Sequence, residues 1–156
     1  MLLLPATWTI EIALLYGIQN SLLNKLQRIQ NAAARLVAKK GKFEHISNIL
    51  QSLHWLPVKS RIEFKLLVLV FKCVYGSAPG YLRELIQLYE PHRNLRSQSK
   101  NLLVKSRVNT KMFGDRAFQN IAPELWNSLP QHLRDIDNLD SFKSQLKTHL
   151  FSQQFS

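Results

Sequence analysis

The run of residues from 58 to 75 constrains the fold of this chain more than any other part of the sequence. It follows a Trp-Leu-Pro turn at residues 55–57, and a proline suits the start of a helix because its missing N–H costs nothing there. Apolar side chains would cover most of the circumference of a helix over residues 58–75. Such a helix must be buried on several sides. The sequence therefore predicts a small, mainly α domain with this helix at its centre.

Further helices are predicted on both sides of the central helix, from apolar residues that recur with the period of a helix. They span residues 20–39, 44–53, 79–89, 114–120, 123–128 and 139–151. The first has apolar residues at spacings of 4, 3, 4 and 3 that we expect to face the core, namely Leu22, Leu26, Ile29, Ala33 and Leu36. The expected inward residues of 44–53 are Ile46, Ile49, Leu50 and Leu53. Those of 79–89 are Leu82, Leu85, Ile86 and Tyr89, and those of 139–151 are Leu139, Phe142, Leu146 and Leu150, with Asn138 as cap.

Residues 90–113 interrupt the helical pattern with prolines, asparagines and serines, which are typical of loops. Residues 102–104 and 110–113 could pair within this region as one short β-hairpin. Residues 1–13 are an atypical N-terminal extension, and 14–156 are expected to form a single helical domain. The extension is apolar but has no basic n-region, so it is a poor match to a signal peptide. No run approaches the ~20 apolar residues of a membrane-spanning helix, and we expect no membrane partner.

The charge balance indicates a polyanionic partner. The chain has 21 basic and 10 acidic residues, a formal net charge of +11. A charge of this sign and size suits nucleic acid or an acidic membrane surface. The excess is uneven, because residues 1–116 hold 18 basic and 6 acidic residues whereas residues 117–156 hold 3 and 4. We therefore expect any anion-binding surface in the first three quarters of the chain.

Three groups of basic residues are candidates for that surface. One lies on an arc of the 20–39 helix, the second forms a stripe on the central helix at spacings of 4 and 7, and the third lies mostly in the 90–113 loop. No base-reading motif accompanies them, so contacts to phosphates are expected. The predicted nucleic-acid-binding residues are Arg28, Arg35, Lys39, Arg61, Lys65, Lys72, Arg93, Arg96, Lys105, Arg107 and Lys111. The alternative is that these side chains only solvate helices or contact another protein.

The sequence offers no constellation of catalytic or metal-binding residues. A polymerase needs carboxylates that converge on two metal ions, and the acidic cluster at residues 135, 137 and 140 is better explained by the start of a helix. The five histidines lack zinc-ligand spacing, and the single cysteine, Cys73, is expected to be buried and inert. We expect Trp55 and Trp126 to anchor the core and His54 to pack in its turn. We therefore predict no enzyme, no cofactor and no small-molecule substrate.

Three stretches carry a family resemblance: Leu26-Gln-Arg-Ile-Gln-Asn-Ala-Ala-Ala-Arg-Leu36, Leu53-His-Trp-Leu-Pro57 and Ala122-Pro-Glu-Leu-Trp-Asn-Ser-Leu-Pro130. Together they resemble the C-terminal tail of reverse transcriptases from non-LTR (LINE-type, jockey-like) retrotransposons, from about residue 14 onward. The resemblance implies a non-catalytic accessory domain that follows the polymerase thumb and contacts template RNA or primer DNA. The polymerase domain of the same element would be a further partner. The alternative is a host-adopted or remnant scaffold that binds protein and has no role with nucleic acid.

Overall fold

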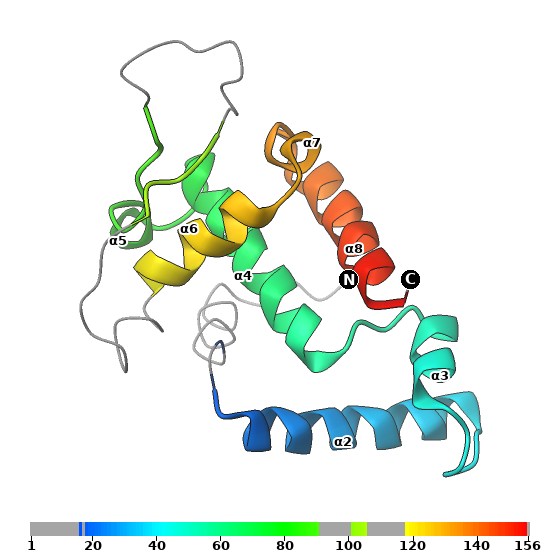
Figure 1. Cartoon of the computed structure of the whole chain (residues 1–156). Coiled ribbons are helices and arrows are strands. Elements are labelled where there is room, and N and C mark those ends of the chain that lie inside the picture. Colours follow the sequence, from blue (N-terminus) through cyan, green and yellow to red (C-terminus); the bar gives the residue numbers. More distant parts are fainter. Residues whose placement is uncertain (1–15, 17, 91–100, 106–117, 156) are drawn as a thin grey trace.

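The computed structural model describes residues 16, 18–90, 101–105 and 118–155, and these residues are mainly helical, as predicted (Figure 1). The longer helices are α2 (Asn20–Ala38), α4 (Val58–Val74), α6 (Phe118–Ser128) and α8 (Leu139–Phe155). Shorter helices connect them, namely α3 (Ile46–Ser52), α5 (Gly80–Arg83) and α7 (Gln131–Arg134).

Helix α4 is the centre of the molecule, and this prediction is confirmed. It contacts α2, α5, α6 and α8, and its side chains are buried around most of its circumference. Leu66 and Val70 are almost completely enclosed. The helix ends where Gly76 takes a φ of +77°, a left-handed conformation that glycine adopts without the cost that a Cβ would add. Because α4 has neighbours on several sides, few of its residues are exposed.

The main core lies between α4, α6 and α8. The Phe142 ring of α8 stacks on the Phe71 ring of α4, with ring centroids 4.5 Å apart, and lies 5.7 Å from the Trp126 ring of α6. Trp126 is fully buried, as predicted, and its Nε1 donates a 2.6 Å hydrogen bond to the carbonyl oxygen of Asn101. The predicted inward residues of α8 are buried or half-buried. Asn138 caps this helix, because its Oδ1 accepts hydrogen bonds from the backbone N–H groups of Asp140 and Ser141.

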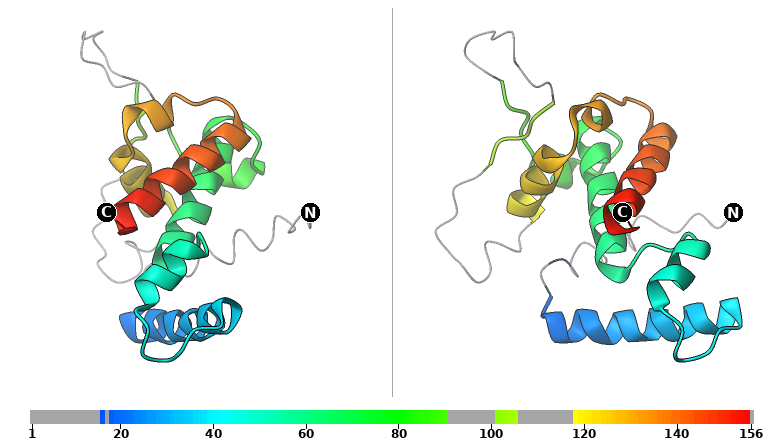
Figure 2. Two further views of the ribbon diagram at one scale, coloured as in Figure 1. Left: turned by 90° about the vertical axis from the view of Figure 1, so that its right-hand side faces the viewer. Right: turned by 45° about the vertical axis from the view of Figure 1, so that its right-hand side comes forward.

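Helices α2 and α3 form a smaller unit at one end of the molecule, where α2 lies across the base of α4 (Figures 1 and 2). Their shared core is a second apolar cluster made by Ala34 of α2 with Ile49 and Leu50 of α3. Trp55 and Phe155 pack against this cluster and connect it to the turn before α4 and to the end of α8. The inward residues predicted for 44–53 are confirmed by this cluster.

The predicted inward face of α2 is wrong. Leu22, Ile29 and Leu36 are exposed by 48 %, 68 % and 80 %, whereas Gln30 and Ala34 are buried. The physical reason is that Gln30 donates a 2.8 Å hydrogen bond from Nε2 to the buried carbonyl oxygen of Leu56. The rotation of α2 is therefore fixed by hydrogen bonds of its glutamines to the turn before α4. The leucines of α2 do not determine it.

Three short elements also differ from the prediction. The helix expected over 79–89 is the single turn α5, because residues 87–89 pair with residues 102–104 through an isolated antiparallel bridge between Leu88 and Leu103. Leu85 and Tyr89 are consequently exposed. The expected pairing of 102–104 with 110–113 involves residues outside those described. The two helical pieces expected near 114–120 and 123–128 form one helix, α6, within the described residues, with Pro123 buried inside it.

Candidate nucleic-acid interface

Helix α4 presents the predicted stripe of Arg61, Lys65 and Lys72 along one side. Arg61 is exposed, and the two lysines are half-buried. Arg61 and Lys65 are one turn apart and line the same pocket, whereas Lys72 lies two turns further along the helix and does not reach it. The structure therefore brings two of the three predicted residues on this helix into a shared site.

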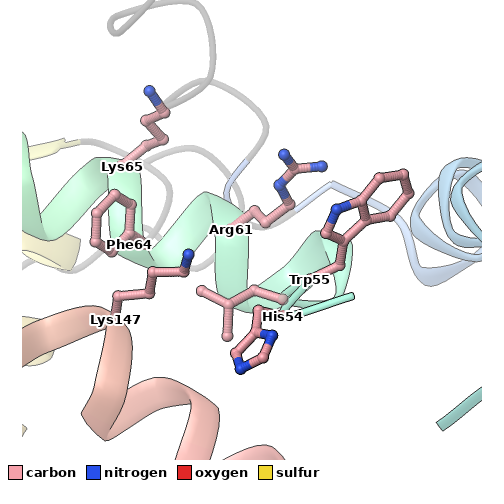
Figure 3. Close-up of a pocket in the computed structure, with 7 residues that line it drawn as sticks. His54, Trp55, Arg61, Phe64, Lys65 and Lys147 are labelled. Atoms are coloured by element: carbon pink, nitrogen blue, oxygen red, sulfur yellow. The ribbon is translucent and has the colours of Figure 1, made fainter. Parts of the chain in front are cut away.

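This pocket lies at the start of α4 and has a volume of about 360 Å³. That volume is within the range of sites that bind small ligands in proteins, roughly 300–1,000 Å³. Figure 3 shows three cationic side chains around it, with the Phe64 ring between two of them. The lining residues are His54, Trp55, Leu56, Arg61, Phe64, Lys65 and Lys147. We call this the cationic pocket.

The turn that forms one wall of the cationic pocket is fixed on both sides. The backbone N–H of Val58 donates to Oε1 of Gln27 at 2.9 Å, and the carbonyl oxygen of Leu56 accepts from Gln30. These two hydrogen bonds attach the turn to α2. His54 takes a φ of 52°, which few residues other than glycine adopt. His54 is exposed, and its ring stacks on the Phe151 ring of α8 with centroids 5.7 Å apart.

Lys147 was not predicted as a site residue. It is exposed on α8, next to the buried Leu146, and α8 brings it to the pocket because α8 packs along α4. The charge balance of residues 117–156 is slightly acidic, and this directed the prediction to the first three quarters of the chain. Lys147 reaches the pocket through tertiary packing. The only signal in the sequence was that its neighbour Leu146 lies on the inward face of 139–151.

The electrostatics of the cationic pocket favour an anion. No acidic residue lines it, and Arg61, Lys65 and Lys147 form no ion pair within the described part of the chain. The two ion pairs found there join other residues, Lys40 to Glu44 and Lys143 to Asp140. Cations that converge in a concave site without counter-charges raise the local concentration of anionic ligands.

Aromatic side chains in such a site can also stack with bases. Trp55 serves here as a half-buried wall, and so it is only partly the core anchor that was predicted.

The other predicted residues lie away from the cationic pocket. Arg28 and Lys39 are exposed on α2, whereas Arg35 is half-buried and its Nε is enclosed without a hydrogen-bond partner. Lys105 is exposed beside the bridge to residues 87–89. Four further predicted residues lie outside those described: Arg93, Arg96, Arg107 and Lys111.

Titratable groups elsewhere show the effect of burial. Cys73 is buried in α4, and desolvation raises the pKa of its thiol to about 11, which makes the reactive thiolate scarce at neutral pH. Burial also raises the pKa of Glu63, and Lys59 partly offsets this shift. Among the described residues, no group of three or more His, Cys, Asp and Glu side chains could hold a metal ion. None of the helices there has the length and apolar character needed to cross a membrane.

Comparisons of the chain with family models, with curated proteins and with solved structures found no match. The functional argument therefore rests on the sequence and on the geometry of the cationic pocket.

Proposed function

We propose that this chain is a non-catalytic nucleic-acid-binding module, an accessory domain of a retrotransposon reverse transcriptase that contacts template RNA or primer DNA. One observation carries this proposal. Arg61, Lys65 and Lys147 converge from two helices on a pocket with aromatic walls and no acidic residue. The proposed ligand is a single strand, because only unpaired bases offer their faces to aromatic side chains.

The proposed binding mode divides the work between charge and stacking. Phosphates lie against Arg61, Lys65 and Lys147, whose guanidinium and ammonium groups donate charge-assisted hydrogen bonds. A base enters the pocket between Phe64 and Trp55, which both line it and are both half-buried. Phosphate contacts carry no sequence information and stacking tolerates every base, so binding with little sequence preference is expected.

The retrotransposon part of the proposal is supported by where the resembling stretches lie. Residues 53–57 include the three that form one wall of the pocket, and residues 26–36 include the glutamines that hold this wall through hydrogen bonds. Residues 122–130 include Trp126 of the main core and Asn127, whose side chain exchanges two 2.9 Å hydrogen bonds with the backbone of Leu103. The stretches that suggest the family are thus the ones on which this site and core depend.

Two lysines on α8 allow a matched test. Lys147 lines the cationic pocket, whereas Lys143 lies one turn earlier and pairs with Asp140. Affinity for a fluorescently labelled single-stranded RNA of about 15 nucleotides is measured by anisotropy at ~50 mM salt. We expect Arg61→Ala plus Lys147→Ala to weaken binding about tenfold, because two phosphate contacts are lost, and Arg61→Ala plus Lys143→Ala to weaken it clearly less. RNA binding that is undetectable at this salt, or equal losses in the two double variants, would contradict the proposal.

A second function is favoured by a different observation. The outward side of α2 carries exposed leucine, isoleucine and valine side chains, which is unusual for a helix on the surface of a globular domain. This observation supports the alternative in which the chain is a protein-interaction module.

A further inference from the structure

Helix α2 is amphipathic, but its polar side faces the rest of the protein and large apolar residues face outward. Its inward side includes Gln27 and Gln30, which hydrogen-bond to the turn before α4, and Asn31, whose Oδ1 accepts from Gln27. The outward side includes large apolar residues with exposed fractions of 37 % to 89 % along α2 and the loop after it: Leu22, Leu26, Ile29, Leu36, Val37 and Phe43. The part of the chain that the structure describes leaves these side chains exposed, so the surface is available to a partner.

Four of the outward residues and the half-buried Ala33 are arranged as a seam. Leu22, Leu26, Ile29, Ala33 and Leu36 follow one another at spacings of 4, 3, 4 and 3, and we call these five residues the α2 seam. This alternation is the heptad spacing with which one helix packs against another through knobs into holes. An apolar line with a helical period fits the period of a helical partner.

Cationic side chains flank the α2 seam. Lys25 and Lys39 stand fourteen residues apart in equivalent heptad positions beside it, with Arg28 one turn from Lys25. Residues 25–42 hold six basic residues and no acidic one, and the nearest acid, Glu44, is already paired with Lys40. A partner that covers the seam therefore meets unpaired positive charge along its edge.

We propose that the α2 seam is a docking site for an acidic amphipathic helix of a partner protein. The partner's apolar residues would pack between those of the seam, and its glutamates or aspartates would lie beside Lys25 and Lys39. Flanking charges of this kind select the partner of a helix pair and set its orientation.

Charge and shape favour this occupant over two others. In a second copy packed antiparallel on the same seam, Lys25 would face Lys39 of the other chain, and like charges across a helix pair are destabilising. A lipid surface would accept a basic amphipathic helix, but it has no period and does not call for heptad spacing. The α2 seam does not include any residue of the cationic pocket, so the two sites can be tested separately.

The test uses the full chain and two designed peptides of about 21 residues. Both have leucine and isoleucine at the two core positions of each heptad, and the flanking positions are glutamate in one and lysine in the other. We expect the acidic peptide to bind at micromolar concentration and the basic peptide at least tenfold more weakly. Ile29→Ser plus Leu36→Ser should weaken acidic-peptide binding at least tenfold without loss of helix content, because both side chains are exposed. Tyr81→Ser, an exposed apolar residue on α5, is the matched control and should bind the acidic peptide as the unmodified chain does.

RNA affinity separates this proposal from the proposed function. Ile29→Ser plus Leu36→Ser should leave RNA affinity unchanged, and Arg61→Ala plus Lys147→Ala should leave acidic-peptide affinity unchanged. The docking proposal is overturned if the acidic peptide does not bind at 100 µM, a concentration well above the ~1–10 µM expected of a helix pair of this size, or if both peptides bind equally. It is also overturned if the seam variant instead abolishes self-association, or abolishes binding to vesicles of phosphatidylserine and phosphatidylcholine.

Discussion

Two glutamines decide which side of α2 faces the body of the protein. Gln30 is buried and donates to the carbonyl oxygen of Leu56, and Gln27 accepts from the backbone N–H of Val58. Leu56 belongs to the Trp-Leu-Pro turn, and Val58 is the first residue of α4, where a backbone N–H has no partner within the helix. A buried backbone group without a hydrogen bond costs free energy comparable to a lost bond, so these two side chains complete the turn as well as orient the helix.

Removal of the Gln30 amide tests this role. Gln30→Ala should lower the free energy of unfolding by about 1–3 kcal/mol, because it leaves the buried carbonyl oxygen of Leu56 without a donor. The control is Gln145→Ala on α8, where the side chain is exposed and the change should stay within about 0.5 kcal/mol. Both are measured by urea denaturation followed by circular dichroism. If Gln30→Ala costs no more than Gln145→Ala, the hydrogen bond does not hold α2 in place.

At the scale of the elements, α4 and α8 could be predicted from the sequence, together with the burial of α4 on several sides and the inward residues of α8. They could be predicted because burial of apolar area dominates when a helix packs in the main core. α2 has about the predicted length but turns a different face inward. Its apolar spacing predicted core contacts, whereas its hydrogen bonds to the turn before α4 determine which face is buried. The helix predicted over 79–89 is too long, and only the single turn α5 forms. The bridge between Leu88 and Leu103 is a long-range pairing that local periodicity does not reveal.

The cationic pocket shows the same limit. Arg61 and Lys65 could be named from the sequence because they lie one turn apart on a predicted helix. Lys147 could not, because it reaches the pocket only through the packing of α8 on α4.

The central place of α4 has a direct test in two leucines. Leu66 and Leu69 are 1 % and 5 % exposed. Leu66→Ala or Leu69→Ala should lower the free energy of unfolding by roughly 2–5 kcal/mol, because each leaves a cavity in a packed core. Leu85→Ala is the control, since Leu85 is 40 % exposed and should cost much less. Chemical denaturation gives all three values, and losses below about 1 kcal/mol at both core sites would be incompatible with a buried central helix.

For the whole molecule, the distribution of charge matters more than its total of +11. The cationic pocket lies where α4 and α8 meet, and a second set of basic residues lies on α2, which crosses the base of α4 (Figures 1 and 2). Our proposed function uses the first of these surfaces, and the docking proposal uses part of the second. A nucleic acid that also touched Arg28 and Arg35 would compete with the partner helix for α2.

Salt dependence counts how many of these cations a nucleic acid neutralises. If a single-stranded RNA contacts about six of them, the logarithm of the binding constant should fall with the logarithm of salt concentration at a slope of roughly −4, because each neutralised phosphate releases condensed counterions. Arg61→Ala plus Lys147→Ala should flatten that slope by about 1 to 1.5, since two contacts disappear. Arg28→Ala plus Arg35→Ala should flatten it by a similar amount if the strand also runs over α2, and should leave it unchanged if RNA is confined to the cationic pocket. Anisotropy titrations of one labelled RNA between ~50 and 200 mM salt give all the slopes. A slope near zero for the unmodified chain would mean that its positive charge serves a protein partner and not a phosphate backbone.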